Sequence, residues 1–474
     1  MSSEPTNLDR LKMARIRDHE LRRQDDVFAA LPLRARALRR YRELSAVYPW
    51  HVVWGYFLGR AADRLRHKLG AAFKPVEDVS ALEDALTVTK STALMQDKLI
   101  QDVIERVQQG IDNGNLLRPI RYSIRITGGL GDALIIARMT RDLQLYLDND
   151  LSFDVYFQSP ALIEPFFRHI PGFMKCIDID LYQRTVELYT FSLHANQFVL
   201  FVTEHFDHRA LLTGKPEVLN LFGHIQRQRT ELDRYVTNHP FLDGAFAAIA
   251  TKRGHKRYTY LHEMLGIPYG GDELKLEIDA TFPTTLGLVP GQYVTIHDGW
   301  DTKFKLAVHR PTKAIPLRIW TDVVKALKAE RPELKLVQLG GKTGDNVPGI
   351  DINLKTRLSF MQSAAVLASA ALHIDSESGL VHLGTALGIR SVVLFGPTNV
   401  DWFGYPQNAN IVPRQCGDCW WSTDTWMDTC PIGHKEPVCT ASIKAGEVAK
   451  AALQMLDRPY EGPVHLGSNT KTLA

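Results

Sequence analysis

The feature that most constrains the fold is a repeated alternation of short β-branched strands with amphipathic helices. A first series has strands at 121–127, 154–159 and 175–180, with a glycine turn at 128–132 and a helix at 133–147. A second series has strands at 293–299, 334–341, 372–378 and 391–398, with helices at 316–332, 359–370, 379–388 and 442–456. Such alternation predicts parallel sheets covered by helices. Two such units in tandem place a cleft at the carboxyl ends of both sets of strands.

The alternation divides the chain into four predicted segments. We expect a basic helical extension at 1–115, an α/β domain at 116–290, a second α/β domain at 291–460 and a flexible tail at 461–474. Residues 181–290 are less regular, and they are expected to hold a further strand at 198–204.

The charge is distributed unevenly along the chain. The net charge of the 474 residues is only +3, which argues against a nucleic-acid polymer as partner. The first 75 residues contain 16 Lys+Arg and 8 Asp+Glu, whereas the other 399 contain 40 and 45. We interpret the basic faces of the extension as solvated helix surfaces. The alternative is that they bind an acidic partner or attach the protein peripherally to a membrane surface.

The N-terminal sequence resembles neither a signal peptide nor a membrane anchor. Acidic residues are mixed into the first 27 positions, and no run approaches the roughly 20 apolar residues of a spanning helix. We therefore expect a cytoplasmic protein, in which thiols stay reduced.

The first glycine turn contains the candidate catalytic group. Gly129 and Gly131 lie between a strand and a helix, where backbone can approach a ligand closely. A dinucleotide fingerprint is weak here, since Leu134 replaces its third glycine and Asp132 would repel a phosphate. A carboxylate at this position suits proton abstraction, and the alternative is that Asp132 merely caps the helix.

The second turn is the candidate anion site. Ser376 or Ser378 can cap a helix whose first turn contains Gly379, and such a helix start suits a phosphate. Glu377 could accept hydrogen bonds from sugar hydroxyls. The tight turn Gly396–Pro397–Thr398 is expected at the rim of the same cleft. Lys313 precedes a long helix and could neutralise a diphosphate, although a solvated surface lysine is the alternative.

Four of the five cysteines lie within 24 positions. Cys416, Cys419, Cys430 and Cys439 can complete a tetrahedron of thiolates around zinc or iron, whereas Cys176 stands alone. With four protein ligands the site would be structural, and His434 could replace one of them. Buried hydrophobic cysteines and a disulfide are the alternatives.

The motifs resemble glycosyltransferase family 9, the bacterial ADP-heptose heptosyltransferases. They are GGLGDALIIAR at 128–138, TKAIPLRIW at 312–320 and ESGLVHLGTALGIRSVVLFGPT at 377–398. The resemblance implies a GT-B fold, with two Rossmann-like domains facing across a cleft. The first domain would bind the acceptor, and the second would bind the nucleotide sugar. It also implies catalysis without a divalent metal.

The resemblance assigns a role to each motif. Asp132 matches the general base, and Gly129 and Gly131 form the glycine turn on the acceptor side. Lys313 matches the lysine that contacts the donor phosphates. Glu377 stands where many members have an aspartate, and Asp375 is an alternative for that role. The implied donor-binding residues are Lys313, Glu377, Ser378, Gly379, Leu380, His382, Gly396, Pro397 and Thr398.

The cysteine loop, residues 416–439, resembles that of the bacterial autotransporter heptosyltransferase subgroup. This implies iron in the loop, a large homo-oligomer, and transfer of heptose to serine or threonine of an autotransporter or adhesin passenger. The runner-up acceptor is the lipopolysaccharide core. Two other classes stay open: a Rossmann-type oxidoreductase that binds NAD, and a metal-stabilised scaffold without catalysis.

Overall fold

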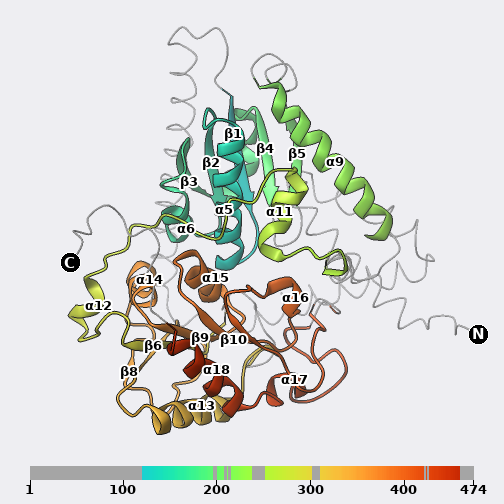
Figure 1. The fold of residues 1–474 in the computed structure, drawn as a ribbon. Helices are drawn as coiled ribbons and strands as arrows, with labels where there is room; N and C mark the ends of the chain where they lie inside the picture. The colour runs from blue at the N-terminus through green and yellow to red at the C-terminus, as the bar shows by residue number, and fades with distance from the viewer. Residues whose placement is uncertain are drawn as a thin grey trace, which may run out of the picture.

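The structure is a computed structural model that describes residues 120–195, 200–207, 211, 215–236, 251–300, 310–420, 423 and 426–458. These residues form two α/β units, one above the other in Figure 1. The predicted helical extension at 1–115 and the predicted tail at 461–474 lie outside the described residues.

The first unit contains a five-stranded sheet in the order β3-β2-β1-β4-β5. Its strands are β1 (Arg121–Ile126), β2 (Ser152–Phe157), β3 (Phe173–Asp178), β4 (Phe191–Ala195) and β5 (Leu200–Phe206). All neighbours are parallel except β5, which runs antiparallel to β4. The strands expected from the sequence are present. β4 was not expected, because it is short and carries Ser and His where a buried strand usually has apolar residues.

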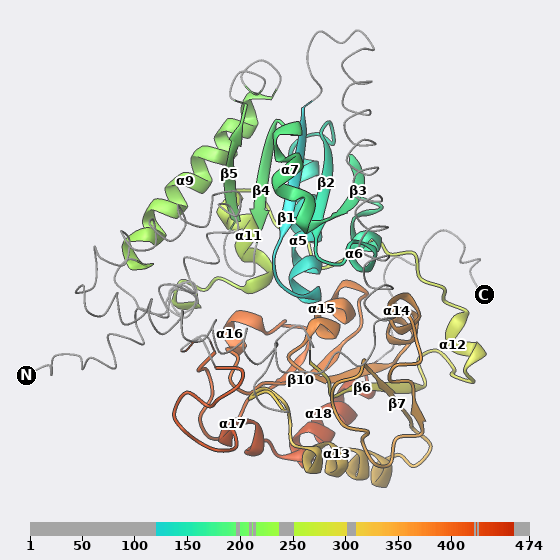
Figure 2. The same ribbon diagram turned by 180° about the vertical axis from the view of Figure 1, so that it is seen from behind.

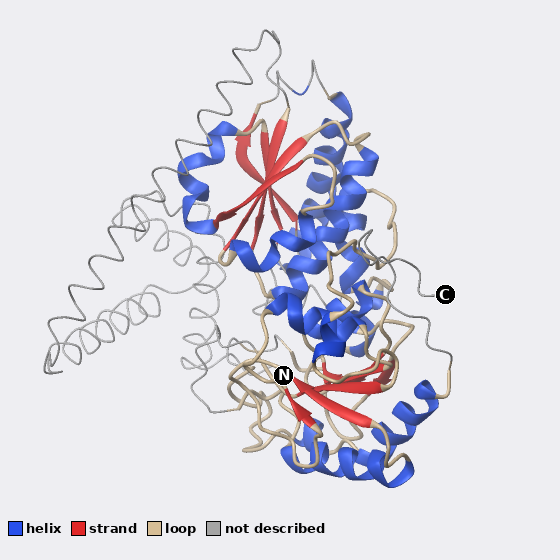
Figure 3. Ribbon diagram, turned by 90° about the vertical axis from the view of Figure 1, so that its left-hand side faces the viewer, coloured by secondary structure: helices blue, strands red, loops and turns tan. Residues whose placement is uncertain are grey.

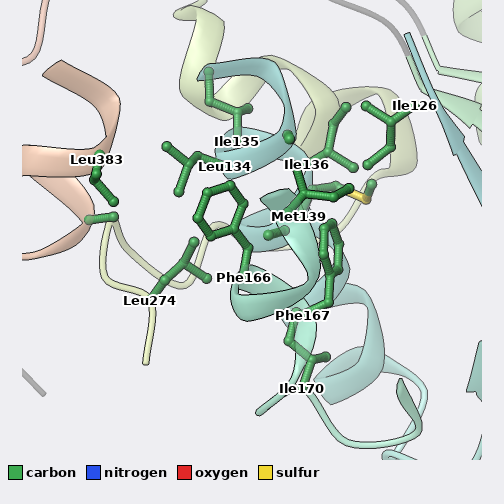
Figure 4. Close-up of a cluster of buried hydrophobic side chains, with 14 of the residues drawn as sticks. Ile126, Leu134, Ile135, Ile136, Met139, Phe166, Phe167, Ile170, Leu274 and Leu383 are labelled. Atoms are coloured by element: carbon green, nitrogen blue, oxygen red, sulfur yellow. The ribbon is translucent and has the colours of Figure 1, made fainter. Parts of the chain in front are cut away.

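Helices cover this sheet on both faces, as Figure 3 shows. They are α5 (Leu130–Tyr146), α6 (Pro160–Phe167), η2 (Ile179–Leu181), α7 (Tyr182–Thr185), η3 (Val186–Leu188), α9 (Pro216–Val236) and α11 (Arg257–Leu265). The short helix α12 (Phe282–Thr285) follows in the chain and lies beside the second unit. The apolar residues of α5 and α6 meet in one buried cluster, which includes Leu134, Met139, Phe166 and Phe167 (Figure 4). This packing fixes the helix that follows the first glycine turn.

The second unit contains a six-stranded, wholly parallel sheet in the order β11-β10-β9-β6-β7-β8. Its strands are β6 (Tyr293–His297), β7 (Lys335–Leu339), β8 (Ile352–Asn353), β9 (Leu372–Ser376), β10 (Ser391–Leu394) and β11 (Ala409–Ile411). Its helices are α13 (Leu317–Glu330), α14 (Phe360–Ala368), α15 (Gly379–Ala386), α16 (Val400–Phe403), α17 (Val438–Ala441) and α18 (Ala445–Leu456). Two α/β units, the second wholly parallel and the first parallel except at β5, confirm the predicted GT-B fold class.

The two units meet where α5 and α15 begin, which is seen from both sides in Figures 1 and 2. The fully buried Arg138 of α5 donates to the hydroxyl of Tyr405 at 2.9 Å and to the carbonyl of His382 at 3.1 Å. The turns that follow β1 and β9 therefore face one another. Among the helices that the structure describes, none is long and apolar enough to cross a membrane.

Candidate active site

Asp132 lies in the first turn of α5, and both of its carboxylate oxygens are engaged. The N–H of Gly129 donates to Oδ2 at 2.9 Å, and the guanidinium of Arg257 donates to Oδ1 at 2.7 Å. Gly128 has φ +134°, and a Cβ there would lie 2.4 Å from Oδ2 of Asp132. The turn therefore needs glycine, both for its backbone conformation and for the space that the carboxylate occupies.

Arg257 is a functional candidate that the sequence did not reveal. It is the first residue of α11 and only 1% of its side chain is exposed, yet it stands 125 residues after the carboxylate that it pairs with. A buried guanidinium beside a carboxylate that is 18% exposed orients that group and neutralises it. No local pattern around position 257 indicates such a pairing.

The second turn approaches the first through contacts between glycines and a histidine. A Cβ on Gly131 would lie 2.5 Å from Cδ2 of His382, and a Cβ on Gly379 would lie 3.3 Å from the backbone nitrogen of Gly131. The structure thus brings the predicted residues Gly131, Gly379 and His382 together. Small residues on both sides allow the two helix starts to touch.

Of the two predicted cap candidates, Ser376 and Ser378, it is Ser378 that caps α15. Its hydroxyl accepts the N–H of Leu380 at 3.1 Å and donates to the carboxylate of Asp375. Asp375 lies at the end of β9, fully buried below the turn. It therefore supports the cap rather than facing the contact between the two units.

Two histidines stabilise the carboxylate form of Asp375. Nδ1 of His297 lies 2.9 Å from Oδ1 of Asp375, and Nε2 of His373 lies 3.1 Å from Oδ2. Burial alone would raise the pKa of Asp375, but the charges and hydrogen bonds of these imidazoles lower it to about 2. Burial would likewise lower the pKa of His297, and the Asp375 carboxylate outweighs this and raises it. The pair is a buried anchor under the second turn.

Lys313 lies beside Glu377 in the second unit. Its ammonium donates to the carbonyl oxygen of Glu377 at 3.1 Å and lies 3.8 Å from the carboxylate. Burial raises the pKa of Glu377; Lys313 opposes this, and the nearby Asp132 and Asp375 carboxylates add to it. Asp132, Lys313 and Glu377 therefore share one electrostatic neighbourhood, although they come from both units.

His382 is held neutral at this junction. Burial, together with the positive charges of Arg138, Arg257 and Lys313, keeps the pKa of His382 well below its usual range. Its Nδ1 lies 2.8 Å from the hydroxyl oxygen of Tyr405, and Nε2 lies 3.9 Å from Glu377. A neutral imidazole here can exchange hydrogen bonds with a ligand without adding charge.

The turn Gly396–Pro397–Thr398 is buried against the cysteine loop. The N–H of Trp420 donates to the carbonyl of Pro397 at 2.9 Å, and a Cβ on Gly396 would lie 2.5 Å from Cγ2 of Thr440. The sequence placed this turn at the rim of the cleft. The contacts that the structure gives it are with the cysteine loop.

The four cysteines of the loop are free thiols, of which Cys416 is exposed and Cys430 and Cys439 are buried. Burial raises the pKa of Cys419 to about 12, with further increments from Cys439, Cys416 and Cys430. Burial also raises the pKa of Cys439. Cysteine sulfur is a ligand that soft cations prefer. Nevertheless, within the described part of the chain no three His, Cys, Asp or Glu side chains are grouped closely enough to hold a metal ion. His434 is exposed.

Comparison with known proteins finds one family that matches part of the chain. Residues 307–425 match the family described as glycosyltransferase family 9 (heptosyltransferase). The lipopolysaccharide heptosyltransferase 1 of Pseudomonas aeruginosa is 30% identical over 112 residues, which are 22% of this chain and 32% of that protein. The match thus spans about a third of that relative. The family match includes Lys313 and Glu377, whereas Asp132 lies outside it.

Solved structures of similar fold include three glycosyltransferases. The dodecameric iron-containing glycosyltransferase TibC of enterotoxigenic E. coli is 16% identical with TM-score 0.47, covering 72% of this chain and 80% of that one. A family 9 glycosyltransferase of Veillonella parvula is 16% identical with TM-score 0.41, covering 71% and 97%. The ADP-heptose lipopolysaccharide heptosyltransferase II of E. coli is 14% identical with TM-score 0.41, covering 71% and 98%.

Proposed function

We propose that this chain is an inverting heptosyltransferase of glycosyltransferase family 9 that uses ADP-heptose, because its motifs resemble that family and residues 307–425 match it. The observation that carries the proposal is the junction of the two turns. It brings a carboxylate of the first unit near a lysine and a capped helix start of the second. A base and an anion site on opposite sides of one junction are what transfer from a nucleoside diphosphate sugar requires.

Asp132 is the proposed general base. It takes the proton from the acceptor hydroxyl as that oxygen attacks the anomeric carbon from the face opposite the leaving diphosphate. A carboxylate has about four lone-pair positions, so the bonds from Gly129 and Arg257 leave room for the acceptor. Arg257 fixes the direction of the carboxylate, which is the geometric requirement for a base.

The second unit stabilises the leaving group. Lys313 and the start of α15 place positive charge and N–H dipoles where the diphosphate becomes more negative during the reaction. Ser378, Gly379 and Leu380 form that helix start. Glu377 is the proposed acceptor of hydrogen bonds from sugar or ribose hydroxyls, with the neutral His382 beside it.

The acceptor is proposed to be a serine or threonine hydroxyl of an autotransporter-type passenger protein. The resemblance of the cysteine loop, residues 416–439, to the autotransporter heptosyltransferase subgroup supports this. The similarity to lipopolysaccharide heptosyltransferase 1 favours the lipopolysaccharide core as the second candidate. Intact-mass analysis of a passenger domain co-expressed with this protein distinguishes them: an added heptose supports the protein acceptor, and an unmodified passenger contradicts it.

Three further properties belong to the same proposal. Cys416, Cys419, Cys430 and Cys439 would hold one structural iron or zinc ion, since thiolates are preferred ligands of both. The protein would act in the bacterial cytoplasm as a homo-oligomer. Metal analysis of the purified protein checks the first property. Less than about half an equivalent of iron plus zinc would contradict it, given the one ion that four thiolates hold.

The activity itself is tested by release of ADP. We expect ADP to be released when the full chain is given ADP-heptose with an acceptor of either class, and no binding of NAD. Tight NAD binding without release of ADP would instead favour the oxidoreductase. Absence of both would favour a scaffold without catalysis.

A further inference from the structure

The residue before Lys313 is fastened to the cysteine loop. The backbone N–H of Thr312 donates to the carbonyl of Met427 at 2.8 Å, and its hydroxyl donates to the carbonyl of Trp426 at 2.7 Å. Thr312 is only 5% exposed and Trp426 only 6% exposed. One threonine therefore makes two bonds, shielded from water, to consecutive carbonyls of the loop.

Lys313 itself is bound on the other side, to the second turn. Its ammonium donates to the carbonyl of Glu377 at 3.1 Å. The dipeptide Thr312–Lys313 thus links the cysteine loop to the residue that precedes the α15 cap. Lysine has a long, flexible side chain, so the place of its charge depends on how firmly its backbone is held.

The cysteine loop is in turn fixed to the body of the second unit. The backbone N–H of Trp420 donates to the carbonyl of Pro397 at 2.9 Å. Its ring lies edge-on to that of Phe403, with centroids 5.0 Å apart. Cys430 and Cys439 are buried. The loop is therefore a packed support that reaches from the end of β10 to the lysine turn.

We propose that Thr312 is a positioning residue, through which the cysteine loop sets the place of the Lys313 ammonium against the donor diphosphate. The inference rests on the proposed donor role of Lys313. It gives the loop a function in donor binding beyond holding the chain together, and it assigns that function to a buried hydroxyl that bonds to the loop. Misplacing a charged group by about 1 Å is enough to weaken its contribution strongly.

The test measures the Kd of ADP for the full chain by calorimetry, so that no acceptor is needed. Thr312→Val removes the hydroxyl and keeps the shape, and one lost hydrogen bond should raise the Kd of ADP about threefold to tenfold. Thr312→Ser keeps the hydroxyl and should restore nearly normal binding. Thr321→Val is the matched control, because its hydroxyl donates to the carbonyl of Leu317 within its own helix, α13. It should leave the Kd unchanged.

A second comparison separates positioning from general destabilisation. Lys313→Met should weaken ADP binding, and adding Thr312→Val to Lys313→Met should weaken it no further, since the charge being positioned is gone. A normal Kd in Thr312→Val beside a weakened Lys313→Met would overturn the inference alone. A normal Kd in Lys313→Met would overturn the proposed donor role of Lys313 and the inference with it. Equal losses in both backgrounds would show a merely structural role.

Discussion

The turn that follows β1 and the turn that follows β9 both begin a helix, yet they fill the helix start differently. At α5 the cap position is Gly129, and the carboxylate of Asp132 folds back onto its N–H. At α15 the cap is the neutral hydroxyl of Ser378, with Lys313 alongside. The first helix start is thus occupied by its own anion, whereas the second stays open to an external one.

This difference shows that two similar strand–turn–helix units can take different roles through one buried charged residue beside each turn. Arg257 offsets the charge of Asp132 from the side and holds the carboxylate in place. Asp375 supports Ser378 from below, where two histidines balance its charge. Each turn therefore has one buried partner that sets its role, and each partner can be removed separately.

The largest effect is expected from Asp132→Asn. The amide keeps the shape but cannot accept the proton, so kcat should fall by about 10²–10⁴, the usual contribution of a general base. Release of ADP from ADP-heptose in the presence of acceptor measures this. Normal turnover in the variant would remove Asp132 as the base and leave it as a cap.

Arg257→Met should have the next largest effect. Removing one partner of a buried ion pair leaves Asp132 misdirected, and we expect kcat to fall on the order of tenfold to a hundredfold with stability lowered by about 3 kcal/mol. Turnover and thermal unfolding together measure this. Arg168→Met is the matched control, since its pair with Glu164 is half exposed and should matter by less than about 1 kcal/mol. Equal effects in the two variants would contradict the special role of Arg257.

The anchor beneath the second turn predicts a pH dependence of stability. The pKa of His297 is raised above 6.5, so its contribution is complete below that pH and is lost as pH rises through the folded pKa. The pKa of Asp375 is lowered from 3.8 to about 2, so its contribution is present above pH 3.8 and is lost as pH falls toward 2. The Asp298 and Lys355 charges also act on His297, in opposite directions.

His297→Gln should therefore lower the Tm most near pH 5 and progressively less above neutrality. Thermal unfolding at a series of pH values measures the difference from the unmodified protein. His169→Gln is the control, because the partner of this histidine is the exposed carboxylate of Glu277. A difference that does not change between pH 5 and 9 would contradict the charged pair.

The smallest effect is expected from Ser378→Ala. Loss of a helix cap costs about 1 kcal/mol and should weaken ADP binding a few-fold, because the helix start loses its order. Ser359→Ala removes the equivalent cap of α14 and should cost similar stability without altering ADP binding. An unchanged Kd of ADP in Ser378→Ala would indicate that the diphosphate does not meet this helix.

The fold was predictable because strands and helices leave a local periodic pattern. The two glycine turns were recognisable because glycines stand between a predicted strand and a predicted helix. Arg257 was not, because its role depends on Asp132, 125 positions earlier in the chain. The link from Thr312 to Trp426 spans 114 positions and is equally invisible locally. The cysteine spacing predicted a gathering of thiols, but spacing alone could not give the distances that decide whether a metal is held.

The central claim is that the first turn serves the chemistry and the second serves the donor. The most direct measurement is the Kd of ADP-heptose for Asp132→Asn and Lys313→Met, determined beside their kcat. We predict that Asp132→Asn binds the donor normally but turns it over poorly, while Lys313→Met binds it weakly. Normal donor binding by Lys313→Met, or equally impaired binding by both variants, would contradict the account.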